Sequence, residues 1–254
     1  MVTSLADLHT WLKLAEDAAR AAGGLLRRRQ PVAVVAESQR DVKLDADRGA
    51  EEVILRALRA GSDFDVLSEE QGAIPGCGAD GWRWIVDPLD GSLNYLRGVR
   101  LCSVAVALWE GDDPRAGAVY DFNGDEMFTG LVGVGSWLNG APIRVSAIDA
   151  RARAVLGTGF PAGTDFSSEA LGGFVTQIRD YRKVRLLGSA ALSLAWVAAG
   201  RLDAYLERDI KLWDVAAGLA VVRAAGGRTV REPSRAAQAL TVYADNAALP
   251  EPTL

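Results

Sequence analysis

Two aspartates three residues apart are the residues of this chain whose types and spacing most clearly predict chemistry. Asp87 and Asp90 lie in the segment WIVDPLDGSLNY (84–95), after an apolar run and on either side of a proline. Pro88 fixes its own φ angle and lacks an N–H group, and Gly91 lets the backbone bend or approach a ligand closely. We therefore expect both carboxylates on a rigid turn at the end of a strand, beside a serine hydroxyl and backbone N–H groups.

These carboxylates predict a site for Mg²⁺. Acids that follow an apolar strand cost free energy unless they are paired or bound to a metal. Mg²⁺ is a hard cation that prefers oxygen ligands and shares its shell with water and phosphate. Further acidic clusters stand where loops meet regular elements, at Asp41/Asp45/Asp47, Glu69/Glu70 and Asp214. Each of these has a simpler alternative, because Asp47 and Asp214 also suit helix caps and the two glutamates a solvated loop.

The overall composition argues against several other functions. The 254 residues carry a formal net charge of −5, which disfavours a nucleic-acid-binding surface. The only histidine, His9, falls on the polar side of an amphipathic helix, so we expect neither a histidine-rich zinc site nor a Ser-His-Asp triad. Cys77 and Cys102 fit neither a disulfide framework nor a thiolate metal site. The chain shows no signal-peptide pattern and no apolar run long enough to span a bilayer, so the cytoplasm is the expected compartment.

Hydrophobic periodicity predicts a layered α+β fold, because helices and strands occur in blocks. Helices are expected over 4–29, around 165–180, over 188–200 and over 213–227, the last one starting at Asp214, and the stretch 41–58 is expected to pass from an acidic turn into a further helix. Short apolar runs indicate strands at 32–35, 64–67, 82–86, 183–187 and 202–207. Five more runs are expected to form antiparallel strands, at 101–109, 116–122, 126–132, 137–146 and 153–159.

The order of these motifs resembles the inositol monophosphatase family of Mg²⁺-dependent, Li⁺-sensitive phosphatases. WIVDPLDGSLNY is similar to the first signature of that family, and LWDVAAGLAVVRAAGG at 212–227 is similar to the second. An acidic turn with a helix and then S-E-E come before the first signature, and G-S-A-A and D-A-Y-x-E come before the second. The match spans roughly residues 35–230.

The resemblance implies a single domain over residues 1–254, an αβαβα sandwich of the sugar-phosphatase type with lobes of roughly 1–150 and 151–254 and the metal site between them. It implies a phosphomonoesterase that uses two or three Mg²⁺ ions on a small polyol phosphate, with inositol 1-phosphate as the first candidate. Histidinol phosphate, fructose 1,6-bisphosphate and 3′-phosphoadenosine 5′-phosphate remain alternative substrates. A homodimer is also implied, and neither nucleic acid nor a membrane is an expected partner.

The resemblance assigns metal ligands residue by residue. Glu69, Asp87 and the backbone carbonyl of Leu89 match the ligands of a first ion. Asp87, Asp90 and Asp214 match those of a second ion, so that Asp87 would bridge the two.

Three residues are implied to act on the attacking water: Glu69, Ser92 and Asp47. The Ser92 hydroxyl, paired with Asp47, would help to hold and deprotonate that water. Glu70 remains the alternative to Glu69, because a slip of one residue would exchange them.

The substrate contacts follow in the same way. Gly91 and Ser92 would present backbone N–H groups to the phosphate. The remaining positions implied to line the substrate are Arg185, Ser189, Ala190 and Glu207, of which Glu207 would accept a substrate hydroxyl. The chain departs from the family after Asp41, where it reads V-K-L in place of the usual V-T.

Phosphate-ester hydrolysis also suits these residues without the family name. A phosphate dianion repels a nucleophile, and two cations held by a bridging carboxylate offset this repulsion and acidify water. Phosphoryl transfer otherwise needs mainly positioning and electrostatics, so a site can dispense with histidine or cysteine. A non-catalytic interaction protein on the same fold is the minor alternative, since some relatives contact transcription machinery. The intact acids at 69, 87, 90 and 214 argue against it.

Overall fold

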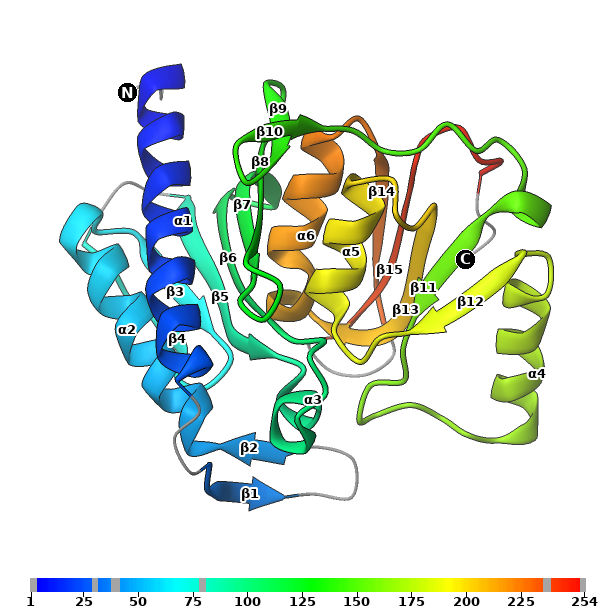
Figure 1. The fold of residues 1–254 in the computed structure, drawn as a ribbon, viewed down its shortest axis with the longest axis horizontal. Coiled ribbons are helices and arrows are strands. Elements are labelled where there is room, and N and C mark those ends of the chain that lie inside the picture. Colours follow the sequence, from blue (N-terminus) through cyan, green and yellow to red (C-terminus); the bar gives the residue numbers. More distant parts are fainter. Residues whose placement is uncertain (1–3, 29–31, 38–41, 78–80, 235–238, 252–254) are drawn as a thin grey trace.

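Helices and sheets alternate in five layers in the computed structural model of this chain (Figure 1). The structure describes residues 4–28, 32–37, 42–77, 81–234 and 239–251. Helices α1 (Leu5–Arg27) and α2 (Asp45–Gly61) cover one face of an eight-stranded sheet, and α5 (Ala190–Ala198) and α6 (Leu212–Ala224) pack on its other face. A five-stranded sheet follows, with α4 (Ser168–Ile178) at its outer side. The αβαβα sandwich expected from the sequence is confirmed.

The local sequence explains why α1 begins where it does. Ser4 accepts a hydrogen bond from the Asp7 N–H, and the Asp7 carboxylate accepts one from the Ser4 N–H, which forms a capping box. The helix then buries one apolar face against the eight-stranded sheet, through residues that include Leu8 and Leu12. His9 is exposed, as its place on the polar side of the helix predicted.

The eight-stranded sheet carries the first signature near its centre. Its order is β10-β9-β8-β7-β6-β5-β3-β4, and its neighbours are antiparallel except for β3 and β5. The run at 137–146 forms two short strands and not one, because Asn139 and Gly140 both have positive φ angles and make the tight turn between them. The strands are β3 (Asp65–Ser68), β4 (Gly72–Ile74), β5 (Trp82–Asp90), β6 (Ser103–Glu110), β7 (Asp113–Asp121), β8 (Glu126–Leu131), β9 (Gly135–Leu138) and β10 (Ala141–Ile143).

The two middle helices pack tightly because small residues face them. A Cβ atom at Gly117 of β7 would lie 2.4 Å from the Ala217 carbonyl oxygen of α6, so only glycine fits this contact. The core between the sheets includes Trp109, Tyr205 and Val242, all of which are fully buried. This packing fixes α6, and with it Asp214 in its first turn, relative to the large sheet.

The five-stranded sheet corrects one prediction. Its order is β12-β11-β13-β15-β14, and β11 (Val155–Thr158) runs parallel to β12 (Lys183–Leu186) and β13 (Ala204–Lys211), whereas the sequence pattern suggested an antiparallel strand at 153–159. The physical reason is that α4 joins β11 to β12 and α5 joins β12 to β13. A helical crossover returns the chain to the same edge of the sheet and makes the joined strands parallel.

The periodicity analysis missed the last two strands and misplaced one helix start. Strands β14 (Arg228–Pro233) and β15 (Ala239–Asp245) form an antiparallel pair at the end of the chain. Helix α6 begins at Leu212 and not at Asp214, and α2 begins at Asp45. The remaining elements are β1 (Val34–Glu37), β2 (Val42–Leu44), α3 (Ser92–Arg97) and a 3₁₀ turn η1 (Arg151–Arg153). Within the described ranges, none of the helices is both long and apolar enough to cross a membrane.

Candidate functional site

Asp87 and Asp90 lie inside strand β5 and not on a turn after it. Asp87 pairs with Ala105 and Asp90 with Ser103, so Pro88 and Leu89 together oppose one residue of β6. This two-against-one arrangement is a β-bulge, which tolerates proline because no ladder hydrogen bond is needed there. The Leu89 N–H donates instead to Asp87 Oδ1 at 3.0 Å. The bulge therefore lies between the two aspartates, and the strand ends at Asp90.

Gly91, the residue after Asp90, has a left-handed backbone conformation. Its φ angle is +91°, and a Cβ atom would lie 3.0 Å from the carbonyl oxygens of both Gly188 and Leu101. Asn94 lies in the same junction, where its Nδ2 donates to Leu101 O (2.7 Å) and Leu187 O (2.8 Å). These contacts join α3 to the chain segment that precedes α5.

The structure brings six carboxyl groups from separate segments into one electrostatically coupled cluster, which we call the carboxylate cluster: Asp47, Glu69, Asp87, Asp90, Glu207 and Asp214. Burial and then repulsion by Glu69, Asp90 and Asp214 raise the pKa of Asp87 well above its ordinary value. Asp214 behaves in the same way: burial and the charges of Glu69 and Asp90 raise its pKa. Ionising all of these acids together is therefore unfavourable unless a positive charge lies among them.

The other members carry smaller shifts. Burial, followed by the charges of Asp47 and Glu70, raises the pKa of Glu69 to about 8. Burial raises the pKa of Glu207 to about 7 and that of Asp90 to about 6. All six carboxyl groups of the cluster thus have a raised pKa, and perturbed pKa values of this kind are frequent at functional sites.

Asp90 is held by the first turn of α5. Ser189 Oγ donates to Asp90 Oδ2 at 2.5 Å, and the N–H groups of Ala191 (2.8 Å) and Ala190 (3.3 Å) also donate to this carboxylate. Ser189 also caps the helix, since its Oγ accepts from Leu192 N. The residues of G-S-A-A thus contact an acid of the first signature, a role that the sequence analysis had not foreseen for positions expected to line the substrate.

Ser92 and Asp47 are joined by a hydrogen bond next to the bulge. Ser92 Oγ lies 2.8 Å from Asp47 Oδ1 and 3.0 Å from Leu89 O, so its proton is shared between two acceptors. The second oxygen of Asp47 accepts from Leu44 N at 2.6 Å, so Asp47 also caps α2. Burial raises the pKa of Asp47 to about 6, although the bond from Ser92 opposes this rise. The capping alternative and the predicted pairing with Ser92 are therefore both present.

Glu69 and Glu70 point to different partners. Glu69 lies close enough to Asp47 for the charge of Asp47 to raise its pKa, and the charge of Glu69 in turn raises the pKa of Asp87, which places Glu69 in the carboxylate cluster. Glu70 forms an ion pair of 2.8 Å with Lys43 on β2, and its side chain is only 5% exposed. The geometry thus favours Glu69 over Glu70 as a ligand, and the lysine of the unusual V-K-L sequence explains where Glu70 goes.

The remaining predicted positions divide between the cluster and its surroundings. Glu207 lies on β13 and accepts from the Tyr205 hydroxyl at 2.8 Å. Asp214 accepts from Lys211 N at 3.1 Å and sits at the third position of α6. Arg185 lies on the edge strand β12, exposed, with Nη1 donating to Val184 O. Among the described residues, no hydrogen bond or ion pair joins Arg185 to the carboxylate cluster.

Asp45 and Glu51 of α2 are acids outside the carboxylate cluster that bond to other parts of the chain. The sequence analysis did not single out Glu51. Asp45 Oδ1 accepts from Ala33 N at 2.9 Å and thereby holds the chain before β1. Asp41, which was grouped with it, lies outside the described residues. Glu51 of α2 is 1% exposed and bonds to the Ser68 and Gln71 side chains. Its signal in the sequence was a glutamate between the buried Ala50 and Ile54, where an apolar residue is expected.

The donor set of the carboxylate cluster fits a hard divalent cation. Its side-chain donors are all oxygens, and their raised pKa values record a negative charge that such a cation would neutralise. As they stand, no three Asp, Glu, His or Cys side chains of the described residues are grouped closely enough to hold an ion among them. Mg²⁺ usually keeps several waters and binds only one or two carboxylates directly, so the other acids of a set would reach it through water.

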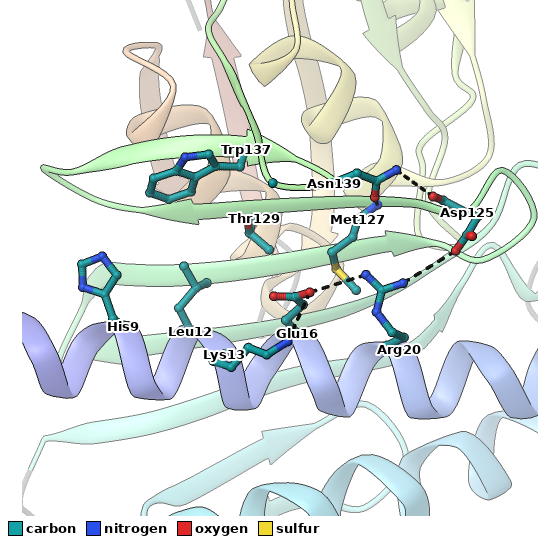
Figure 2. Close-up of a pocket in the computed structure, with 11 residues that line it drawn as sticks. His9, Leu12, Lys13, Glu16, Arg20, Asp125, Met127, Thr129, Trp137 and Asn139 are labelled. Atoms are coloured by element: carbon teal, nitrogen blue, oxygen red, sulfur yellow. Dashed lines mark hydrogen bonds and ion pairs between the residues drawn. The ribbon is translucent and has the colours of Figure 1, made fainter.

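A separate cavity lies far from this chemistry in the fold. It has a volume of about 580 Å³ and lies between α1 and the β8–β9 hairpin, where His9, Arg20 and Trp137 line it (Figure 2). Its charged groups are already paired with one another, since Glu16 contacts Lys13 and Arg20, and Arg20 also contacts Asp125. The cavity contains no member of the carboxylate cluster.

Comparison with known proteins places this geometry in a family. The family model described as "Inositol monophosphatase family" matches residues 7–246. An inositol-1-monophosphatase of Mesorhizobium japonicum is 40% identical over 74% of this chain and 71% of its own length. The Nus factor SuhB of Pasteurella multocida is 36% identical over 87% of this chain and 84% of its own length.

Solved structures agree with the sequence relatives. The extragenic suppressor protein suhB of Bartonella henselae superimposes with a TM-score of 0.83 at 33% identity and covers 94% of both chains. The inositol monophosphatase of Anabaena (Nostoc) sp. gives a TM-score of 0.82 at 33% identity, over 94% of this chain and 92% of that one. The residues of both signatures lie within the matched range, and membership supports a metal-dependent phosphatase. This chain belongs to the inositol monophosphatase family.

Proposed function

We propose that this protein is a Mg²⁺-dependent phosphomonoesterase that hydrolyses a small polyol phosphate, most simply inositol 1-phosphate. The observation that carries the proposal is the convergence of Glu69, Asp87, Asp90 and Asp214 from three chain segments into one coupled cluster. Glu69, Asp87 and the Leu89 carbonyl would hold a first ion, and Asp87, Asp90 and Asp214 would hold a second. The reaction would use two or three such ions. Bound Mg²⁺ would supply positive charge for the attacking and leaving oxygens and lower the pKa of water.

The chain's own residues would hold and move the proton of the attacking water. Ser92 Oγ donates to Asp47 Oδ1, so its lone pairs remain able to accept a hydrogen bond from water. A proton passing from water to Ser92 Oγ would displace the hydroxyl proton onto Asp47. With a pKa of about 6, Asp47 is ionised at neutral pH and yet basic enough for this role. Glu69 lies beside Asp47 and would orient the same water.

The substrate would lie between α3 and β13. The Gly91 and Ser92 N–H groups would bind the phosphate, and Ala190 would border the polyol. One Glu207 oxygen accepts from Tyr205, which leaves the other to accept a substrate hydroxyl. Asn94 does not help to choose the substrate, because its amide is committed to the carbonyls of Leu101 and Leu187.

The test is phosphate release from inositol 1-phosphate, histidinol phosphate, fructose 1,6-bisphosphate and 3′-phosphoadenosine 5′-phosphate, each with Mg²⁺ and with EDTA. We expect release that depends on Mg²⁺, is fastest with inositol 1-phosphate and is inhibited by Li⁺. Asp90→Asn should abolish it. Faster release from another of the four would replace the substrate and keep the chemistry, whereas no release from any would overturn the proposal.

A second candidate rests on the relatives named Nus factor SuhB, which make a binding role on this fold worth separating from catalysis. Asp90→Asn decides between them in cells: an enzyme's function should be lost, and that of a binding protein should survive. The intact carboxylate cluster favours the enzyme.

We further propose a homodimer in the cytoplasm. Apolar side chains are exposed along the edge formed by α4 and β12, where Val175 is 55% and Leu186 57% exposed. Light scattering on the purified protein tests the oligomeric state, and a monomer at micromolar concentration would contradict it.

A further inference from the structure

A buried glutamate outside the carboxylate cluster holds the turn that carries Glu69. Glu51 lies on α2 and is 1% exposed. One of its oxygens accepts from Ser68 Oγ and from Gln71 N (3.2 Å), and the other accepts from Gln71 Nε2 (2.7 Å). Burying a carboxylate is costly unless it is well bonded, and here both oxygens are used.

These bonds enclose the Glu69–Glu70 turn from both ends. Ser68 is the last residue of β3, and Gln71 directly precedes β4. The Glu69 N–H donates to Val86 O of the neighbouring strand at 3.2 Å, and Lys43 draws Glu70 toward β2. With both flanks fixed and Glu70 committed elsewhere, Glu69 is the acid of this turn that faces the cluster.

Helix α2 thus contributes two acids one turn apart, each to a different part of the site. Asp47 binds Ser92, and Glu51, four residues later on the same face of the helix, binds the turn of Glu69. We propose that Glu51 is a positioning residue that presents Glu69 for cation binding. This inference rests on the proposed function, because it gives Glu69 a ligand's role.

The test is calorimetric titration of the purified full chain with MgCl₂ in the absence of substrate, comparing wild type, Glu51→Gln and Glu52→Gln. Glutamine has the same shape but places a donor against Ser68 or Gln71, so the turn loses part of its support. We expect Glu51→Gln to weaken Mg²⁺ binding by about tenfold or more, as is typical when groups behind a metal ligand are changed. Glu52 is exposed, and its variant should bind Mg²⁺ as the wild type does.

A companion variant guards against a general loss of folding in Glu51→Gln. Gln71 is exposed and donates twice to Glu51, so Gln71→Ala should keep the wild-type melting temperature in EDTA and still weaken Mg²⁺ binding. Both variants should need more Mg²⁺ for half-maximal activity while retaining most of kcat at saturating Mg²⁺. A purely structural role would lower the melting temperature and leave Mg²⁺ affinity unchanged.

The outcomes separate this inference from the proposed function. If the wild type binds Mg²⁺ and both Glu51→Gln and Gln71→Ala bind it equally well, Glu51 does not position Glu69 and the inference is overturned. If the wild type itself neither binds Mg²⁺ nor releases phosphate, the proposed function fails and the inference falls with it.

Discussion

The Ser92 hydroxyl donates a hydrogen bond to Asp47 Oδ1 at 2.8 Å, although 45 residues separate them in the chain. The bond connects the start of α3 to the first turn of α2, and the same hydroxyl also reaches the Leu89 carbonyl at 3.0 Å. The Ser92 hydroxyl therefore connects Asp47, whose pKa is about 6, to the Leu89 carbonyl in the β5 bulge. This is the arrangement that a proton acceptor for water would need.

Ser92→Ala should lower kcat by about a hundredfold or more, because it breaks the path from water to Asp47. Ser92→Thr keeps the hydroxyl and should retain most of the activity. Mg²⁺ binding, followed by calorimetry, should change much less than kcat in both variants, since the Ser92 hydroxyl is not one of the proposed ligands. Steady-state rates of Ser92→Ala equal to those of the wild type would remove Ser92 and Asp47 from the mechanism.

Stability should depend on pH much more strongly without metal than with it. In EDTA, the raised pKa values of Asp47 and Asp90 (about 6) and Glu69 (about 8) mean that the folded state binds more protons than the unfolded state, where these groups titrate near 4. The free energy of unfolding should then fall as pH rises from about 4 to about 8. Saturating Mg²⁺ favours the ionised forms and should remove most of this fall.

Thermal melting at several pH values, in EDTA and in MgCl₂, measures this effect. The rise in melting temperature caused by Mg²⁺ should be small near pH 5 and largest near pH 8. NaCl at matched ionic strength is the control for screening. A melting temperature that is insensitive to Mg²⁺ at every pH would count against the cation site.

Ser189→Ala should destabilise the protein by about 1–2 kcal/mol, because the residue caps α5 and also bonds Asp90. Ser189→Thr preserves the hydroxyl and is the matched control. Since Asp90 would lose one of its three donors, Mg²⁺ affinity should fall in the alanine variant and be restored by threonine. Chemical unfolding and calorimetry give the two quantities, and an alanine variant unchanged in both would show that the helix N–H groups suffice to hold Asp90.

Much of the fold followed from local patterns, whereas most of the candidate site was assigned through the resemblance to the family. The signature around Asp87 and Asp90 predicted where chemistry lies, because aspartates beside a proline after an apolar run have few structural explanations. The periodicity of α1 is likewise encoded within a few residues. The turn at Asn139-Gly140 is local too, but 137–146 was predicted as one strand, so the turn was missed.

What escaped prediction depends on contacts between distant segments. The β5 bulge exists because Pro88 and Leu89 oppose a single residue of β6, and pairing register is not visible in one strand alone. The parallel direction of β11 depends on where α4 and α5 return the chain. Ser189 was assigned to the substrate, yet its bond to Asp90 spans 99 residues. Glu51 gave only the weak signal of an acid on a buried helix face.

Glu207→Gln should distinguish substrates by their hydroxyl groups. Glu207 is buried beside Tyr205, and its ionised carboxylate would accept a hydroxyl of the polyol. Replacing a charged acceptor by a neutral amide weakens such a bond by roughly 1.5 kcal/mol, so KM for a polyol phosphate should rise about tenfold. The phosphate ester p-nitrophenyl phosphate lacks that hydroxyl and should keep its kcat/KM.

The wild-type KM for the polyol phosphate should also fall as pH rises through about 7, the pKa of Glu207, because the acceptor is then ionised. Tyr205→Phe is the control: it removes the donor to Glu207 but leaves the carboxylate in place, so it should change KM less than Glu207→Gln does. Steady-state kinetics on both substrates provide the comparison. Equal losses on the two substrates would mean that Glu207 supports the site as a whole and does not select the polyol.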